Sequence, residues 1–126
     1  MLSKKDIRPV LNLNSSGEEE AFQNITLRPI LKLQHSIIIL MFKSWAVKHK
    51  IRLSSITVEG LKEILENSLS KNNTIKNQLL GITIGHFTDE EYETYALNSS
   101  EYNKRIFTMI KQRLFDSFEE IKNITE

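Results

Sequence analysis

Six consecutive apolar residues at positions 37–42, Ile-Ile-Ile-Leu-Met-Phe, lie within a stretch that has no turn signal on either side. A helix through this stretch is apolar on nearly all of its faces. Because a helix at a protein surface needs a polar face, such a helix has to be surrounded by other parts of the chain. The sequence therefore predicts a compact all-α single-domain bundle of four to five helices around a central buried helix.

The composition is that of an ordinary soluble protein, with 40% hydrophobic and 26% charged residues in a chain of 126 residues. This length fits one domain with a real hydrophobic core. The chain contains no cysteine, which excludes disulfides and thiolate chemistry and favours a cytoplasmic location. The apolar run is much shorter than the ~20 residues that span a bilayer, so no membrane association is expected.

The net charge of +1 hides an asymmetry along the chain. Residues 1–56 carry nine Lys and Arg against four Asp and Glu, whereas residues 57–126 carry eight against twelve. Such a division fits ordinary solvated surfaces, complementary faces within one fold, head-to-tail association, or a basic patch for an acidic partner.

Residues 1–17 are predicted to be an N-terminal arm, and residues 18–126 the helical-bundle domain. Pro9 blocks a helix through its position, and Asn, Ser and Gly dominate positions 12–17. The sequence Ile-Arg-Pro-Val-Leu-Asn-Leu-Asn at 7–14 resembles Leu-Arg-Pro-Ile-Leu-Lys-Leu-Gln at 27–34. Two copies are too few for a repeat protein, so coincidence is the default interpretation. The functional alternative is that the arm docks on a partner's helix.

The central helix is predicted from about residue 30 to residue 49, after a break or kink near residues 27–28 caused by Pro29. Residues at helical spacing form its predicted apolar stripe. These are Ile30, Leu33, Ile37, Leu40, Met41, Ser44 and Val47. Trp45 on the same helix is predicted to lie in the core with a hydrogen-bond partner for its indole N–H.

Two later helices have clear start signals. Thr57 is the expected cap of one helix, and Thr88 with Glu91 three residues later forms a capping box before another. Phe87 and Tyr92 flank this box as a hydrophobic staple.

The stretch 79–85, Leu-Leu-Gly-Ile-Thr-Ile-Gly, fits a short buried strand as well as a helix. A lone strand has nothing to pair with here, so we expect a helix that opens at Asn73 or Thr74. Gly81 and Gly85 would then allow a neighbouring helix to approach closely, at a cost of ~1 kcal/mol each in helix propensity.

The last helix is predicted over residues 103–122, packed against the 30–49 helix. Its apolar stripe is Ile106, Phe107, Ile110, Leu114, Phe115 and Phe118. The residues that exceed the needs of one helix face form a candidate interface for self-association. They are Phe107, Leu114, Phe115 and Phe118.

Two binding sites are weaker candidates. The segment 57–78 resembles a helix-turn-helix whose polar second helix offers side chains able to read base edges. The candidate nucleic-acid contacts are Lys71, Lys76, Asn77 and Gln78. The turn lacks the usual glycine, and neighbouring acidic residues would repel phosphates. A small-molecule or metal pocket at the corner formed by His86, Tyr92 and Tyr95 is the other candidate.

Catalytic motifs are not found. No histidine follows a Glu or Asp by three residues, and the His-Glu-x-x-His, Gly-x-Ser-x-Gly and glycine-rich phosphate-loop patterns do not occur. The acidic run at 89–93 is explained by its position in the first turn of a helix. We therefore expect no catalytic residue, no cofactor and no metal.

Three motifs resemble a family of short bacterial helical proteins, some of which are labelled glyoxalase. They are Leu-Arg-Pro-Ile-Leu-Lys-Leu-Gln at 27–34, Gly-Ile-Thr-Ile-Gly-His-Phe-Thr at 81–88 and Tyr-Asn-Lys-Arg at 102–105. The resemblance covers roughly residues 18–115 and implies a shared fold. Glyoxalases of either type bind metal through ligands on strands or through a His-x-His-x-Asp-His cluster, and this chain has neither. The expected function is a non-catalytic protein–protein interaction or self-association module, with a DNA-binding regulator as the first alternative.

Overall fold

The computed structural model describes residues 3–9 and 17–123, and these residues contain helices and no strand. The all-α fold predicted from the sequence is thereby confirmed. The helical elements are α1 (Glu18–Phe22), the π-helix η1 (Gln23–Leu27), α2 (Arg28–Leu33), α3 (His35–Lys48), the 3₁₀ turn η2 (Leu53–Ser55), α4 (Val58–Glu63), the π-helix η3 (Ile64–Leu69), α5 (Asn73–Ile84), α6 (Asp89–Ala96), α7 (Ser99–Asp116) and α8 (Phe118–Lys122).

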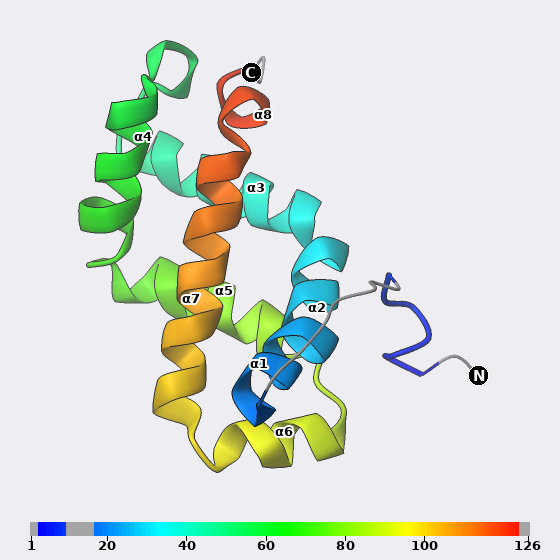
Figure 1. The fold of residues 1–126 in the computed structure, drawn as a ribbon. Coiled ribbons are helices and arrows are strands. Elements are labelled where there is room, and N and C mark those ends of the chain that lie inside the picture. The colour runs from blue at the N-terminus through cyan, green and yellow to red at the C-terminus, as the bar shows by residue number, and fades with distance from the viewer. Residues whose placement is uncertain (1–2, 10–16, 124–126) are drawn as a thin grey trace.

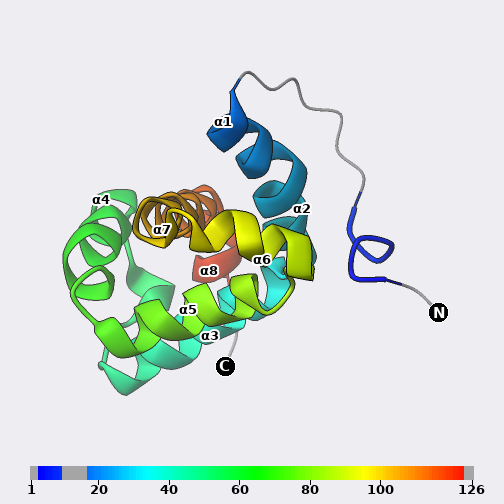
Figure 2. The same ribbon diagram turned by 90° about the horizontal axis from the view of Figure 1, so that it is seen from below.

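The central helix of the bundle is α7 rather than α3. It contacts α3, α4, α5 and α6, and Figure 1 shows it running across the molecule with α3 and α5 behind it. Seen from below, α6 lies across the end of α7 (Figure 2). The predicted C-terminal helix is divided at Ser117 into α7 and the short α8.

The predicted apolar stripe of α3 was assigned to the wrong face. The buried side chains are Ile38, Ile39, Phe42, Trp45 and Ala46, whereas Ile37 is 46% exposed, Leu40 54% and Val47 57%. A run of six apolar residues has no periodicity that would indicate which side faces the core. The side that packs is decided by α5 and α7, and α3 is not surrounded by protein.

The break expected before Pro29 lies elsewhere. Pro29 sits in the first turn of α2, directly after the π-helix η1, and helical structure continues through it. The sharp change of direction comes at Gln34, where the segment Glu18–Leu33 meets His35–Lys48 at 63°. No single helix in the described part of the chain is long and apolar enough to cross a membrane; only that bent pair meets the criteria of length and composition together.

The predicted caps are confirmed. The Thr57 hydroxyl accepts the backbone N–H of Gly60 at 2.9 Å, and Thr88 and Glu91 form the complete capping box of α6. Residues 79–84 are helical as predicted and Gly85 is the C-cap of α5, which begins at Asn73, one of the two predicted openings, after the N-cap Asn72.

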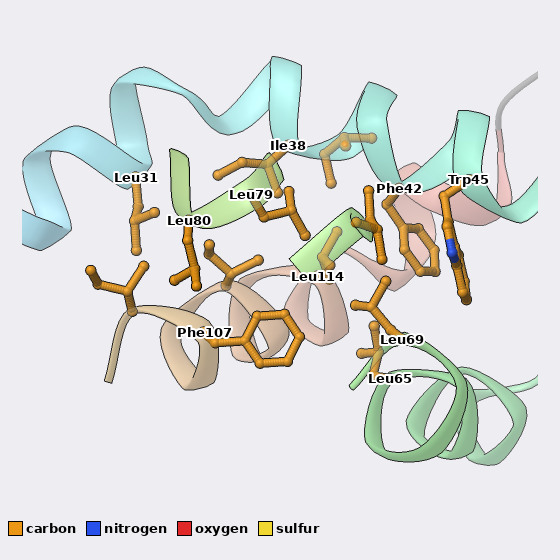
Figure 3. Close-up of a cluster of buried hydrophobic side chains, with 14 of the residues drawn as sticks. Leu31, Ile38, Phe42, Trp45, Leu65, Leu69, Leu79, Leu80, Phe107 and Leu114 are labelled. Atoms are coloured by element: carbon orange, nitrogen blue, oxygen red, sulfur yellow. The ribbon is translucent and has the colours of Figure 1, made fainter. Parts of the chain in front are cut away.

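One hydrophobic core joins side chains from all the long helices. Figure 3 shows Ile38 and Phe42 of α3 and Leu79 of α5 pointing toward Leu114 of α7. All four side chains are completely buried in the folded chain. Trp45 at one end of this cluster stacks on Phe42 with ring centroids 5.8 Å apart. The core therefore fixes the positions of α3, α5 and α7, which carry the surfaces described next.

Candidate functional site

A groove runs between the outer side of α3 and the first turns of α5. Its volume is about 500 Å³. The lining consists of Ile37, Leu40, Met41, Ser44, Trp45, Lys48 and His49 from α3 with Asn72, Thr74, Ile75 and Gln78 beside them. Ile37, Leu40 and Met41 make one end of the groove apolar, and the ionisable groups among the lining residues, Lys48 and His49, are basic. We refer to it as the α3–α5 groove.

The polar end of the α3–α5 groove is ordered by hydrogen bonds. The Nδ1–H of His49 donates to the backbone oxygen of Trp45 at 2.9 Å, which leaves Nε2 to accept from the Asn72 amide at 3.4 Å. The Trp45 ring is buried as predicted, but its indole N–H has no hydrogen-bond partner among the described residues. The groove therefore has one fixed polar end and one apolar end.

The outer face of α6 has the opposite charge. Tyr92 is 51% exposed and Leu97, at the C-cap, is 88% exposed. Asp89, Glu90 and Glu93 are exposed on the same short helix. Asp89 lies three residues before Tyr92 and four before Glu93, and Glu93 lies four before Leu97, so these side chains follow one another along a single exposed surface. This surface, the acidic α6 face, combines apolar and acidic side chains.

The interface predicted on α7 is for the most part inside the protein. Phe107 is 4% exposed and Leu114 is completely buried, because the face of α7 that carries them packs against α3, α4 and α5. These two side chains belong to the core and are not available to another protein. Phe115 and Phe118 are half-buried and pack against the edge of the core.

The candidate nucleic-acid contacts do not share one face. Lys76 extends over the Phe107 ring, with its Nζ 5.0 Å from the ring centroid, and so lies toward α7. Gln78 lines the groove toward α3, while Lys71 and Asn77 are exposed. A helix that reads a DNA groove presents its contacts on one side. The geometry therefore gives the helix-turn-helix interpretation no support.

The corner with His86, Tyr92 and Tyr95 is occupied by the chain itself. Tyr95 is buried, and its hydroxyl donates to the Asn103 side chain at 2.6 Å. His86 is half-buried, and burial followed by the charges of Arg8 and Lys4 lowers its pKa. Among the described residues, no three His, Asp or Glu side chains gather so as to hold a metal ion.

Arg8 of the N-terminal segment fills this corner. It is 8% exposed and donates from both terminal nitrogens to the carboxylate of Glu91 at 2.8 Å. It also donates to the backbone oxygen of His86, and Lys4 donates to the backbone oxygen of Phe87 at 2.8 Å. The described part of the arm thus docks on its own chain.

A cluster of arginines lies in a cleft between α2 and α7, and the sequence patterns did not indicate it. The cleft has a volume of about 550 Å³. Its lining is Gln23, Arg28, Leu31, Lys104, Arg105, Thr108, Met109, Gln112, Arg113, Asp116 and Ser117. Four of these side chains are basic and one is acidic. We call this site the basic cleft.

The arginines of the basic cleft are held in different ways. Arg105 donates to Gln23 at 3.1 Å and pairs with Glu19 at 3.2 Å. Arg28 donates from Nε to the Asn24 side chain at 2.9 Å. Arg113 donates to Nδ1 of His35 at 3.2 Å. Burial, followed by the charge of Arg28, lowers the pKa of Arg113, with Asp116 acting in the opposite direction. The guanidinium nevertheless remains charged at any physiological pH.

One sequence signal bears on both arginine sites. Arg8 and Arg28 occupy the same position in the two copies of the Arg-Pro motif. Each lies next to a proline and ends in a polar site, the first against Glu91 and the second in the basic cleft. No family model, no curated protein and no solved structure matches this chain.

Proposed function

We propose that this protein acts by association with proteins, in the first place with further copies of itself, through the α3–α5 groove. The observation that carries this proposal is the exposure of Ile37 and Leu40 at the edge of the groove. Contiguous exposed apolar surface with a polar rim is typical of interaction sites. α3 buries its other side in the core, so the exposed side is held in a fixed position.

The occupant that fits the groove best is the acidic α6 face of a second copy. The groove carries Lys48 and His49 and no carboxylate among its lining residues. The α6 face presents Tyr92 and Leu97 beside the exposed acids Asp89 and Glu93. Apolar side chains would enter the groove while Glu93 meets the basic rim, and complementary charge of this kind favours encounter and register.

Such a contact joins two different surfaces, so it is heterologous. The pair would then keep a free α6 face on one copy and a free groove on the other, and further copies would add until a ring closes or a chain forms. Association would therefore rise with concentration and fall with salt, because Lys48 and the α6 acids are solvent-exposed and screened by ions.

The test is sedimentation velocity on the wild type and three variants. Leu40→Glu damages the groove, Leu97→Lys damages the α6 face, and Val58→Glu is the control at another exposed apolar position. We expect the wild type and Val58→Glu to associate and the other two variants to remain monomeric. An equimolar mixture of Leu40→Glu and Leu97→Lys should give a discrete dimer, because one intact groove and one intact α6 face remain.

Two results would overturn the proposal. One is a wild type that stays monomeric up to roughly 1 mM, a concentration at which even a binding free energy of about −4 kcal/mol would be detected. The other is association that survives Leu40→Glu and is lost in Phe115→Glu, which would move the contact to the outer edge of α7. If association is lost in Leu40→Glu but kept in Leu97→Lys, the groove is the interface, and the α6 face of a second copy is not what binds in it.

A further inference from the structure

We propose that the basic cleft between α2 and α7 binds an elongated small organic phosphate, with Arg28 and Arg113 holding the phosphate group. This site is separate from the α3–α5 groove, and the two sets of lining residues share no member. The inference therefore does not depend on self-association.

The basic cleft carries four basic side chains and one acidic side chain. Arg105 has carboxylate partners in Glu19 and Glu101. Within the described residues, no ion pair joins Arg28, Lys104 or Arg113 to a carboxylate, although Asp116 lies in the same cleft and Glu18, Glu19 and Glu20 line an adjoining hollow with Arg28. The lining of the basic cleft thus carries more positive than negative charge, and an anionic ligand would reduce the repulsion among its cations.

The polar contacts of the two arginines leave donors free for a ligand. Arg28 uses Nε for Asn24, and Arg113 uses one terminal nitrogen for His35. Both contacts are with uncharged acceptors, so they orient the guanidinium groups without neutralising them; His35 in turn contacts Glu120 through Nε2 at 3.1 Å. The one acid of the cleft, Asp116, accepts from the Gln112 amide at 2.9 Å. Paired guanidinium forks match the oxygens of a phosphate group.

The shape of the cleft indicates that the ligand is larger than a bare phosphate ion. Lys104 and Arg113 are nine residues apart on α7, which corresponds to ~13 Å along a helix. Between them lie Met109, which is half-buried, and Leu31, which is 1% exposed and forms the floor from α2. A volume of about 550 Å³ falls within the usual range for small-molecule sites. The organic part of the ligand would cover this apolar floor, and a second acidic group would reach Lys104.

The methionines provide a reporter for each site. The chain has three; Met109 lines the basic cleft, and Met41 lines the α3–α5 groove. With ¹³C-methyl methionine, titration with phenyl phosphate should shift the Met109 signal in a saturable manner and leave that of Met41 in place. At equal ionic strength, inorganic phosphate and succinate should bind more weakly, and 4-carboxyphenyl phosphate more tightly than phenyl phosphate.

Variants assign the roles. Arg28→Gln and Arg113→Gln should each lower the affinity for phenyl phosphate by roughly tenfold or more, because each variant loses charge-assisted hydrogen bonds. Arg52→Gln removes the same charge at an exposed position outside the cleft and should leave the affinity unchanged. Lys104→Gln should remove the difference in affinity between 4-carboxyphenyl phosphate and phenyl phosphate, and it should leave the affinity for phenyl phosphate unchanged. Circular dichroism checks each fold, and the exposed Arg28 carries the test if the Arg113 variant does not fold.

The proposal is overturned by an unchanged Met109 signal at millimolar phenyl phosphate, or by equal weakening in Arg52→Gln and Arg28→Gln. Tighter binding of succinate than of phenyl phosphate would also overturn it, since the site would then select carboxylates. Because Met41 reports on the groove separately, a negative result at Met109 leaves the association proposal to its own test.

Discussion

The carboxylate of Glu91 links three parts of the chain. It accepts the backbone N–H of Thr88 at 2.9 Å as part of the helix cap, the hydroxyl of Thr26 at 2.9 Å, and both terminal nitrogens of Arg8. Burial by itself raises the pKa of Glu91, but the hydrogen bonds from Arg8, Thr88 and Thr26 and the charge of Arg8 outweigh it and lower the pKa to about 2.

This depressed pKa makes the stability of the protein depend on acid pH. The ordinary value is 4.5, so the ionised carboxylate contributes its full stabilisation above about pH 5. That contribution, about 3 kcal/mol for a shift of this size, is lost as the pH falls toward 2. Urea unfolding at a series of pH values should show this loss in the wild type and a flatter profile in Glu91→Gln.

The control for this measurement is Glu90→Gln, which changes the exposed neighbour in the same helical turn. It should keep the wild-type dependence. If Glu91→Gln kept it as well, the acid sensitivity would arise from other groups, and the Arg8 contact would not hold in solution.

At the scale of a helical element, α5 contains a glycine, Gly81, whose replacement should stabilise the helix. Gly81 and Gly85 were expected to admit a neighbouring helix, but a Cβ at Gly81 would meet nothing within 4 Å, and one at Gly85 would meet only the backbone oxygen of Gly81 at 3.2 Å. The glycine at 81 therefore costs helix propensity without a packing benefit.

Gly81→Ala should accordingly raise the free energy of unfolding by about 1 kcal/mol, the propensity difference between the two residues in a helix interior. Gly85→Ala is the matched control and should stabilise less, because its new methyl group contacts a carbonyl oxygen. Thermal and urea unfolding measure both. A loss of stability in Gly81→Ala would indicate that a neighbour does approach this position.

At the scale of the whole molecule, α7 organises the bundle, and its inner and outer residues should differ sharply. Leu114 is completely buried between helices, whereas Leu97 is 88% exposed at the end of α6. We expect Leu114→Ala to cost about 2–5 kcal/mol in unfolding free energy, and Leu97→Ala to change it by less than about 0.5 kcal/mol. A small loss of unfolding free energy in Leu114→Ala would indicate that this side chain is exposed, as the predicted interface on this helix requires.

The sequence by itself determined the local features of this protein. The helical class, the caps at Thr57 and Thr88 and the apolar stripe of α7 through Ile106 and Ile110 follow from residue type and spacing within one or two turns. Such signals extend over only a few residues, and these features form without contacts to distant parts of the chain.

Only the tertiary structure decided which surfaces remained free. The buried side of α3 depended on how α5 and α7 pack, because residues 37–42 are apolar in every direction. The ion pair of Arg8 with Glu91 joins residues 83 positions apart, and the basic cleft joins Arg28 to Arg113 from two helices. A contact between distant segments has no periodic trace in the sequence, so these sites appear only when the helices are placed against one another.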